Sequence, residues 1–210
     1  IIAIIGIIGF LGYKYYETYV VKNNSEDFVD AFGNQADTNI GNNTSFLPSG
    51  DVDYGGVEEG NTTEGGSSSI TDKRERYNGY IVSGTIEIPE TNLKSPVLAQ
   101  CEYSLKSLET AVVETYGPGL NQVGNTTISG HNYRNGTFFS NNKKLNIGDR
   151  IFITDETGKR LSYTIYDKFE AEENYSDYMT RDTQGAIEIS LSTCTDDSKA
   201  RLIILAKADV

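Results

Sequence analysis

Few side chains in this 210-residue chain are suited to covalent chemistry. The chain has two cysteines, Cys101 and Cys194, and a single histidine, His131. Cysteine–histidine catalysis needs one residue of each type, brought together by folding rather than by closeness in the sequence. His131 lies 63 positions before Cys194 (194 − 131), with several predicted strands between them. The sequence therefore offers one histidine and at most two thiols for a nucleophilic site.

Cys194 has a candidate cationic neighbour in Arg201. Residues 187–194 and 201–206 are predicted strands joined by a polar loop, which indicates an antiparallel hairpin. If Cys194 pairs with Arg201, then Ser192 pairs with Ile203, and directly opposed residues share a face. A guanidinium beside a thiol favours the thiolate and can stabilise negative charge on a carbonyl oxygen under attack. The alternative, from the hairpin alone, is a small core cysteine beside a surface arginine.

His131 follows a predicted strand and a turn, within NTTISGHNYRNG. Gly130 directly before it allows a tight bend that presents a side chain at a strand end. A lone histidine in a polar loop is by default solvated, but its type and place make it the candidate partner of Cys194. Cys101 follows SPVLAQ at another strand end and is predicted to be a structural thiol, because a disulfide to Cys194 would remove the nucleophile.

The elements that must position these residues are short apolar runs from about Tyr77 to the end of the chain. Alternation is clear in the later runs, where Ile187, Ile189 and Leu191 share one face. Many short strands with few helical stretches predict an all-β barrel or sandwich, with short helices near 103–110 and 137–142. The runs are YIVSGTIEI, SPVLA, NTTISG, RIFIT, LSYTIYDK, AIEISLST and RLIILA.

The first 76 residues have a different character. Residues 1–11 read IIAIIGIIGFL, which is too short to span a bilayer alone, since a span takes about 20 residues. We predict that residues 1–21 are the outer part of a transmembrane signal anchor, the alternative being a buried apolar helix or strand. Residues 22–76 are rich in Gly, Asn, Ser, Thr and acid, which predicts a flexible linker.

The acidic character of the chain belongs to that linker. Residues 22–72 hold ten acidic residues and one lysine, a charge of −9 out of the net −12. Residues 73–210 hold 16 basic and 19 acidic residues, a charge of −3. This balance argues against a nucleic-acid surface, which needs clustered Lys and Arg. There is also no CxxC motif or Cys/His cluster of the kind that binds a metal.

Three motifs resemble the sortases of Gram-positive bacteria, a family of membrane-anchored cysteine transpeptidases. Ile128-Ser-Gly-His131-Asn resembles the family's histidine motif. Leu191-Ser-Thr-Cys194 resembles its TLxTC signature, with Ser192 at the variable position. Arg201-Leu-Ile-Ile, seven positions after the cysteine, resembles its arginine strand. Each motif is weak alone, but their order and spacing agree together.

The resemblance extends from about Gly79 to the end of the chain. Ile88-Pro89 and Ser95-Pro96-Val97 resemble the family's opening strands. Ser190 departs from the apolar or threonine-like residue that is usual there. The resemblance implies an eight-stranded β-barrel catalytic domain over residues 77–210, preceded by the N-terminal membrane helix and the flexible linker.

The resemblance also implies a reaction. The Cys194 thiolate would attack the Thr–Gly bond of an LPxTG-like sorting signal and form a thioacyl enzyme, which an amine of a cell-wall precursor then resolves. His131 would protonate the leaving amine and deprotonate the incoming one, and Arg201 would hold the substrate or the oxyanion. Thr193 and Ser192 are the candidate substrate-binding residues. The expected location is the cell membrane, single-pass, with the catalytic domain outside.

Several alternatives stay open. The acceptor amine belongs to a pilin lysine if the chain is a pilin-polymerising sortase, and Asp53-Tyr54 resembles the lid of such enzymes, although a solvated linker residue is favoured. No cofactor is expected. Acidic residues between 170 and 177 could form half of a calcium site like that of some class A sortases, but residues 131–145 hold no acid to complete it.

Two other classes of protein compete with a sortase. A non-enzymatic, membrane-tethered binding domain would use the barrel without the thiol. An L,D-transpeptidase would carry an SHGC-type motif, and no histidine lies near Cys194 in this sequence.

Overall fold

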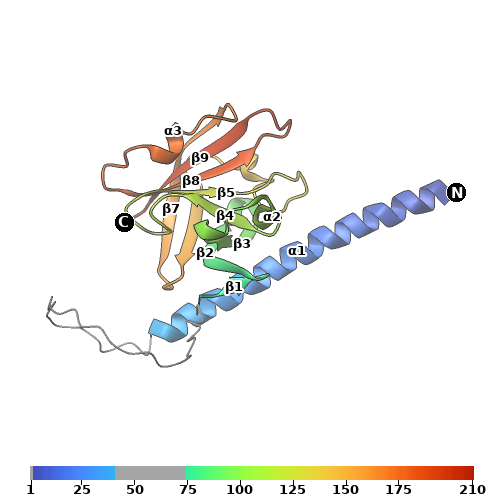
Figure 1. The fold of residues 1–210 in the computed structure, drawn as a ribbon, viewed down its shortest axis with the longest axis horizontal. Helices are drawn as coiled ribbons and strands as arrows, with labels where there is room; N and C mark the ends of the chain where they lie inside the picture. The colour runs from blue at the N-terminus through green and yellow to red at the C-terminus, as the bar shows by residue number, and fades with distance from the viewer. Residues whose placement is uncertain (1, 41–73) are drawn as a thin grey trace, which may run out of the picture.

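The computed structural model describes residues 2–40 and 74–210, and its strands form a closed barrel (Figure 1). Around the barrel the order is β2-β3-β4-β5-β8-β9-β7-β6, and β6 pairs back with β2. A short strand β1 (Arg76–Tyr77) extends β2 outside this ring. The predicted eight-stranded barrel is therefore confirmed. Its strands are β2 (Tyr80–Ile88), β3 (Leu93–Leu98), β4 (Val112–Tyr116), β5 (Gly124–Ser129), β6 (Arg150–Asp155), β7 (Arg160–Ala171), β8 (Ile187–Cys194) and β9 (Arg201–Ala208).

The apolar runs of the sequence correspond to seven of these strands, and β4 is the one that the pattern did not predict. Of the two predicted helices, the first is a single turn, α2 (Leu105–Leu108), capped by Ser104. The second is wrong, because the segment forms turns that end in the 3-10 helix η3 (Asn142–Lys144). Two other 3-10 turns, η1 (Pro89–Thr91) and η2 (Gln100–Glu102), and a short helix α3 (Asp177–Thr180) complete the barrel's connections.

Alternate side chains along the strands fill the barrel, as a period of two requires. On β8 the inward residues Ile189 and Leu191 are buried, and on β7 Tyr163 and Ile165 are fully buried. Tyr163 donates its hydroxyl to Asn121 Oδ1 at 2.8 Å, so the one polar atom of this large core side chain is satisfied. The interior is thus a packed core, and chemistry is confined to the barrel's ends and outer face.

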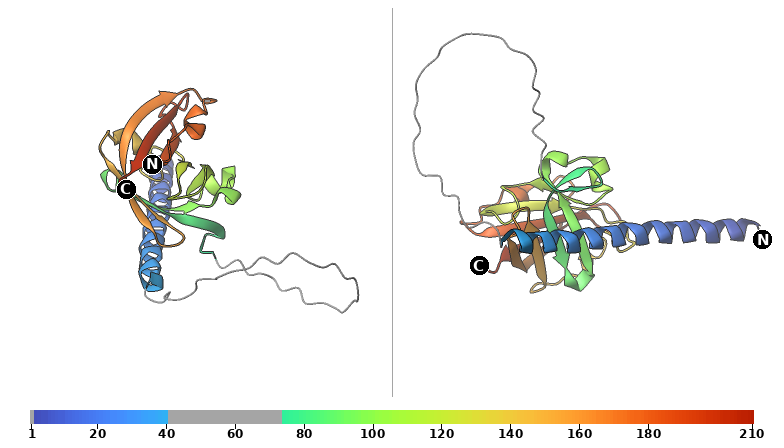
Figure 2. Two further views of the ribbon diagram at one scale, coloured as in Figure 1. Left: turned by 90° about the vertical axis from the view of Figure 1, so that its left-hand side faces the viewer. Right: turned by 90° about the horizontal axis from the view of Figure 1, so that it is seen from below.

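A long helix, α1 (Ile2–Ile40), runs alongside the barrel, and its N-terminal part projects beyond it (Figures 1 and 2). Val29 and Phe32 are buried against the barrel, and Val21 and Phe28 pack there in part. These positions recur at the spacing of one helix face. The prediction that a flexible linker starts at residue 22 is therefore wrong for residues 22–40. Residues 41–73, including Asp53 and Tyr54 of the proposed lid, lie outside the described residues.

The predicted N-terminal membrane helix is not supported. In the described parts of the chain, no helix combines the length and apolar character needed to cross a membrane. The reason is composition: α1 continues past the apolar residues 2–11 into Lys14, Glu17 and further polar residues. Its apolar start and its polar, barrel-packed remainder belong to one continuous helix.

The docking of α1 predicts a stability effect at Phe32, which is 8% exposed. We expect Phe32→Ala to lower the free energy of unfolding by about 3–5 kcal/mol, because it removes a buried ring from a packed interface. Phe10, which is 62% exposed on the same helix, is the matched control, and Phe10→Ala should leave stability unchanged. Urea unfolding of the full chain measures both. Equal effects of the two substitutions would show that α1 does not pack as described.

Candidate active site

The β8–β9 hairpin brings Cys194 and Arg201 together. Cys194 pairs with Arg201 and Ser192 with Ile203, which confirms the predicted register. Arg201 Nη1 donates a hydrogen bond to Cys194 Sγ. Cys194 is partly exposed, whereas residues 188–193 before it on β8 are buried. The thiol therefore sits at the open end of the hairpin with a guanidinium donor beside it.

The parallel pairing of β5 and β8 brings His131 to the same end. Gly124 pairs with Ile187 and Ser129 with Ser192, so partners along this ladder differ by 63 positions. His131 and Cys194 are also 63 positions apart in the sequence, and each lies two residues beyond the ladder's last pair, Ser129 and Ser192. Gly130 N donates to Ser192 O at 3.1 Å, which extends the pairing to the residue before the histidine. The two residues thus leave adjacent strands at one edge of the barrel.

Gly130 is required by close packing rather than by a left-handed turn. A Cβ atom at this position would lie 2.8 Å from Val112 Cγ1 and 2.9 Å from Phe139 Cδ2. Such distances are shorter than carbon atoms tolerate, so any side chain would push the strand end away from β4. The glycine before His131 therefore fixes how closely the histidine loop approaches the barrel.

A polar clamp joins the histidine loop to the cysteine loop. Asn132 Nδ2 donates to the backbone oxygen of Cys194 at 3.0 Å and to Asp196 Oδ1 at 3.0 Å. Asp196 also accepts a hydrogen bond from Lys143. The hydrogen bond from Lys143, and to a smaller extent that from Asn132, lowers the pKa of the Asp196 carboxyl. Asn132 was part of the histidine motif, but its contact with the cysteine strand was not predicted.

The His131 ring lies against Tyr133, with ring centroids 4.8 Å apart. Partial burial lowers the pKa of the imidazole below its ordinary value, the Glu109 carboxylate raises it, and the Arg201 charge lowers it again. The net direction is downward, so the neutral imidazole predominates at neutral pH. A neutral imidazole can accept a proton, as a general base must.

Arg201 is shared between the thiol and a carboxylate. Its second terminal nitrogen, Nη2, donates to Glu173 Oε1 at 2.6 Å. Glu173 follows β7, whose last residue Ala171 pairs with Arg201, so strand register places this acid beside the guanidinium. The sequence indicated Glu173 only as part of an acidic loop, and the distance that makes it a partner of Arg201 arises from the fold.

The acidic loop was also the candidate for half of a calcium site. Within residues 2–40 and 74–210, no group of three or more His, Cys, Asp or Glu side chains is placed to hold a metal ion. The loop instead packs onto the outer face of β9 through Tyr178, which contacts Ile203 and Leu205 in one apolar cluster.

Ser192 and Thr193, the predicted substrate-binding residues, are both buried. Ser192 Oγ is hydrogen-bonded to the Tyr178 hydroxyl at 3.2 Å, beneath the loop that carries α3. Thr193 points to the opposite side of β8 from Cys194, as strand alternation requires, and its buried hydroxyl has no hydrogen-bond partner among the residues that the structure describes. Both side chains thus occupy packed positions beside the partly exposed thiol.

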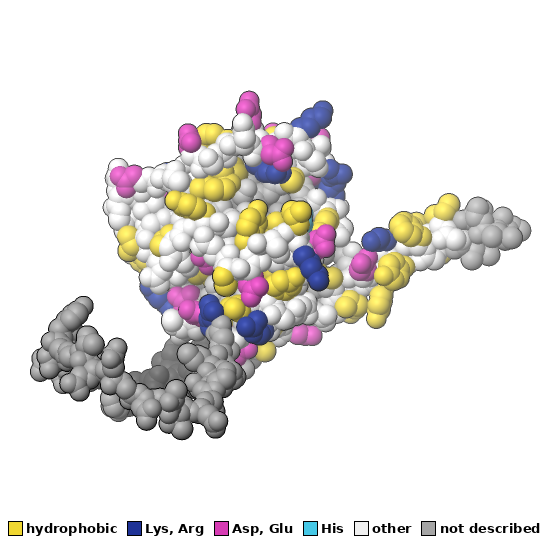
Figure 3. Space-filling view, viewed as in Figure 1, with side chains coloured by type: hydrophobic (Ala, Val, Ile, Leu, Met, Phe, Trp, Pro, Cys, Tyr) yellow, Lys and Arg dark blue, Asp and Glu magenta, His cyan; other side chains and the backbone are white. Residues whose placement is uncertain are grey.

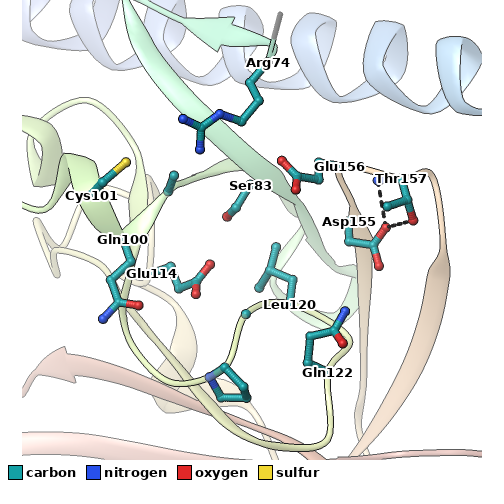
Figure 4. A pocket seen from close by; sticks show the side chains of 13 residues that line it. Arg74, Ser83, Gln100, Cys101, Glu114, Leu120, Gln122, Asp155, Glu156 and Thr157 are labelled. Atoms are coloured by element: carbon teal, nitrogen blue, oxygen red, sulfur yellow. Dashed lines mark hydrogen bonds between the residues drawn. The ribbon is translucent and has the colours of Figure 1, made fainter. Parts of the chain in front are cut away.

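Cys101 lies at the other end of the barrel. It lines a separate cavity of about 670 Å³ that also contains Arg74, Glu114 and Glu156 (Figure 4). Cys101 follows the C-terminal end of β3, and Cys194 is the last residue of β8. Because β3 and β8 run in opposite directions, their C-terminal ends lie at opposite ends of the barrel. The only histidine of the chain is at the Cys194 end, and no disulfide joins the two cysteines.

The arrangement at the Cys194 end suits nucleophilic acyl transfer. A partly exposed thiol is suited to act as a nucleophile, a neutral imidazole from the adjacent strand to act as a base, and a guanidinium to donate hydrogen bonds to a developing negative charge. Each group comes from a different strand, β8, the end of β5 and β9, held by direct hydrogen-bonded pairing.

Comparisons with known proteins give one consistent result. The sortase-domain family model matches residues 86–209. No curated protein matches the chain. Among solved structures, sortase A from Corynebacterium diphtheriae is 24% identical with a TM-score of 0.56, over 62% of this chain and 62% of that chain. The match thus spans less than two thirds of that protein.

Two further solved structures have the same fold. Sortase C-1 from Actinomyces oris is 21% identical with a TM-score of 0.55, over 60% of this chain and 73% of that chain. A sortase D5 transpeptidase from Clostridium perfringens is 21% identical with a TM-score of 0.58, over 91% of this chain and 99% of that chain. Because the family match covers more than half of the sequence and the closed barrel agrees with these structures, the chain belongs to the sortase family.

Proposed function

We propose that this protein is a cysteine transpeptidase that cleaves an LPxTG-like sorting signal and joins the cleaved surface protein to an amine. The observation that carries the proposal is the hydrogen bond from Arg201 to Cys194 Sγ, at the strand end where His131 also emerges. Membership of the sortase family supports the substrate class. The acceptor is the amine of a cell-wall precursor, or a pilin lysine in the alternative that remains open.

In the first half-reaction, the neutral His131 imidazole takes the thiol proton and the Cys194 thiolate attacks the Thr–Gly carbonyl carbon. The C–N bond breaks, and the imidazolium gives its proton to the leaving amine. Since burial disfavours the charged imidazole, the proton is readily passed on. The products are a thioester on Cys194, a free amine and a neutral imidazole.

In the second half-reaction, an acceptor amine loses its proton to His131 and attacks the thioester carbonyl. The C–S bond breaks, an amide forms, and the thiolate regains a proton from the imidazolium. Arg201 serves both halves, because the planar guanidinium holds several donors in fixed directions. One terminal nitrogen contacts Sγ and the other is held by Glu173, so the guanidinium is fixed beside the thiol, where its donors can bind the oxygen of a carbonyl under attack.

We also propose that the protein acts at the outer surface of the cell membrane. The support is an exposed apolar and aromatic sleeve on the projecting part of α1 (Figure 3). Water-exposed apolar patches of this kind mark contact with lipid or protein. The sleeve consists of Ile7, Ile8, Phe10, Leu11, Tyr13, Tyr15, Tyr16 and Tyr19, each more than half exposed.

The two cysteines should differ completely in function. We expect Cys194→Ala to abolish the thioacyl adduct with an LPxTG-like peptide, whereas Cys101→Ala should keep activity within about twofold of wild type, because only Cys194 has the guanidinium and the histidine at its end of the barrel. Mass spectrometry of the intact protein detects the adduct. Equal losses in the two variants would assign a catalytic part to Cys101.

Arg201→Lys separates directed hydrogen bonding from charge. Lysine keeps the positive charge but lacks the planar fork of donors, so kcat/KM for peptide cleavage should fall about 10²–10³-fold, the usual loss for one oxyanion donor. If the arginine only favoured the thiolate, the lysine variant would be nearly as active as wild type. Rates of wild type, Arg201→Lys and Arg201→Ala across pH 6–9 decide between the two.

The pKa of His131 can be measured directly, because the chain has one histidine and therefore one titrating imidazole signal in an NMR spectrum. We expect a pKa below 6.5 in the wild type. Arg201→Ala removes a nearby positive charge and should raise it. Arg160→Ala, on the far end of β7, is the control that should not shift it. A wild-type pKa above 6.5 would contradict the described burial.

A further inference from the structure

A second cavity adjoins the candidate active site at Tyr133, whose ring contacts His131. It has a volume of about 620 Å³ and lies between α1 and the loop that follows His131. The helix contributes Lys14, Glu17, Thr18 and Val21, and the barrel contributes Glu109, Tyr133, Asn135, Thr137 and Phe138. A hydrogen bond from Asn135 Nδ2 to Thr18 Oγ1, 3.3 Å long, joins the two walls.

The cavity shares a wall with the catalytic imidazole. Tyr133 lies between them: its ring is 4.8 Å from the His131 ring and 5.8 Å from the Phe138 ring, measured between centroids. Phe138 is buried and holds this stack in place, whereas Tyr133 is 45% exposed. A molecule in the cavity would therefore lie one aromatic ring away from His131.

The charge of the cavity favours a cation. Lys14 and Glu17 neutralise each other in an ion pair of 2.8 Å. The Glu109 carboxylate forms no ion pair or hydrogen bond with any residue that the structure describes, and it acts on both aromatic neighbours, raising the pKa of His131 and of Tyr133. The exposed face of Tyr133 offers a second attraction, because an aromatic ring binds a cation on its face.

We propose that this cavity is the binding site of the acceptor, a primary amine in its ammonium form, and that Glu109 is the residue that selects for the positive charge. This inference rests on the proposed transpeptidase function and names the entry route of its second substrate. The ammonium binds at Glu109 against Tyr133. It gives one proton to neutral His131, which releases that proton to solvent. The free amine then attacks the Cys194 thioester, the C–S bond breaks, and the second amine proton passes through His131 to the leaving sulfur, so an amide and the Cys194 thiol form.

The test compares a cationic with a neutral nucleophile on the full chain. Glycinamide is largely an ammonium ion at pH 7, whereas hydroxylamine is uncharged. We expect Glu109→Gln to raise the KM for glycinamide about twofold to fivefold, a typical effect for one exposed charge contact, and to affect hydroxylamine much less. Glu156→Gln is the matched control, since it removes the same charge at the opposite end of the barrel, in the cavity of Figure 4.

Other outcomes overturn the inference. An equal rise for both nucleophiles would mean that Glu109 acts on folding or on the thioester rather than on the ammonium. No rise for glycinamide, or the same rise in Glu156→Gln, would place the acceptor elsewhere.

A binding measurement separates this inference from the proposed function. Glycinamide added to the wild-type chain should shift the NMR signals of His131 and Tyr133, and these shifts should be weaker in Glu109→Gln. If no thioacyl enzyme forms but the shifts appear, the transpeptidase proposal fails while the ammonium site stands. If the thioacyl enzyme forms and glycinamide causes no shifts, the site assignment fails alone.

Discussion

The parallel pairing of β5 with β8 is the constraint on which the candidate active site depends. Strands that run in the same direction end at the same edge, so the residues that follow them meet there. The constant offset of 63 positions places His131 beside the end of the strand that carries Cys194. β8 also pairs with β9 from the opposite direction, which adds Arg201. A shift of one residue in either ladder would turn one of these side chains to the wrong face.

The loop after β5 holds this arrangement at some conformational cost. Arg134 and Phe138 have φ angles of 58° and 48°, in the left-handed region that costs a non-glycine residue about 1 kcal/mol or more. Hydrogen bonds offset the cost: Phe139 N donates to His131 O, and Tyr133 N donates to Ser140 Oγ, both at 3.1 Å. The strained turn sets Tyr133 against the imidazole and opens the cavity beside it. The same loop conformation therefore sets both the position of the histidine and the shape of the cavity.

Helix α1 is continuous from residue 2 to residue 40, and it connects the sleeve on its projecting part to the histidine loop. Its buried residues Val29 and Phe32 fix it to the barrel, and Thr18 fixes it to the histidine loop. At a rise of about 1.5 Å per residue, Leu11 lies roughly 10 Å along the helix from Thr18. If the sleeve contacts a membrane, the catalytic end of the barrel is held at a set distance from the lipid.

Local patterns in the sequence predicted the type of fold, and residue type and spacing indicated Cys194, His131 and Arg201 as the candidate chemical residues. Short apolar runs between turn signals predicted seven strands, because such runs depend only on local composition and periodicity. A hairpin with Cys194 opposite Arg201 was one register that the sequence allowed, and the structure has that register. β4 has no strong alternation, and the helical stripe from Val21 to Phe32 is diluted by acids and amides, so both were missed and residues 22–40 were assigned to a linker. Contacts such as Asn132 with Cys194, Glu173 with Arg201 and Tyr133 with His131 were decided by the tertiary structure alone. They join segments far apart in the chain, or depend on a loop's exact turn, and no local pattern in the sequence encodes the distance between such side chains.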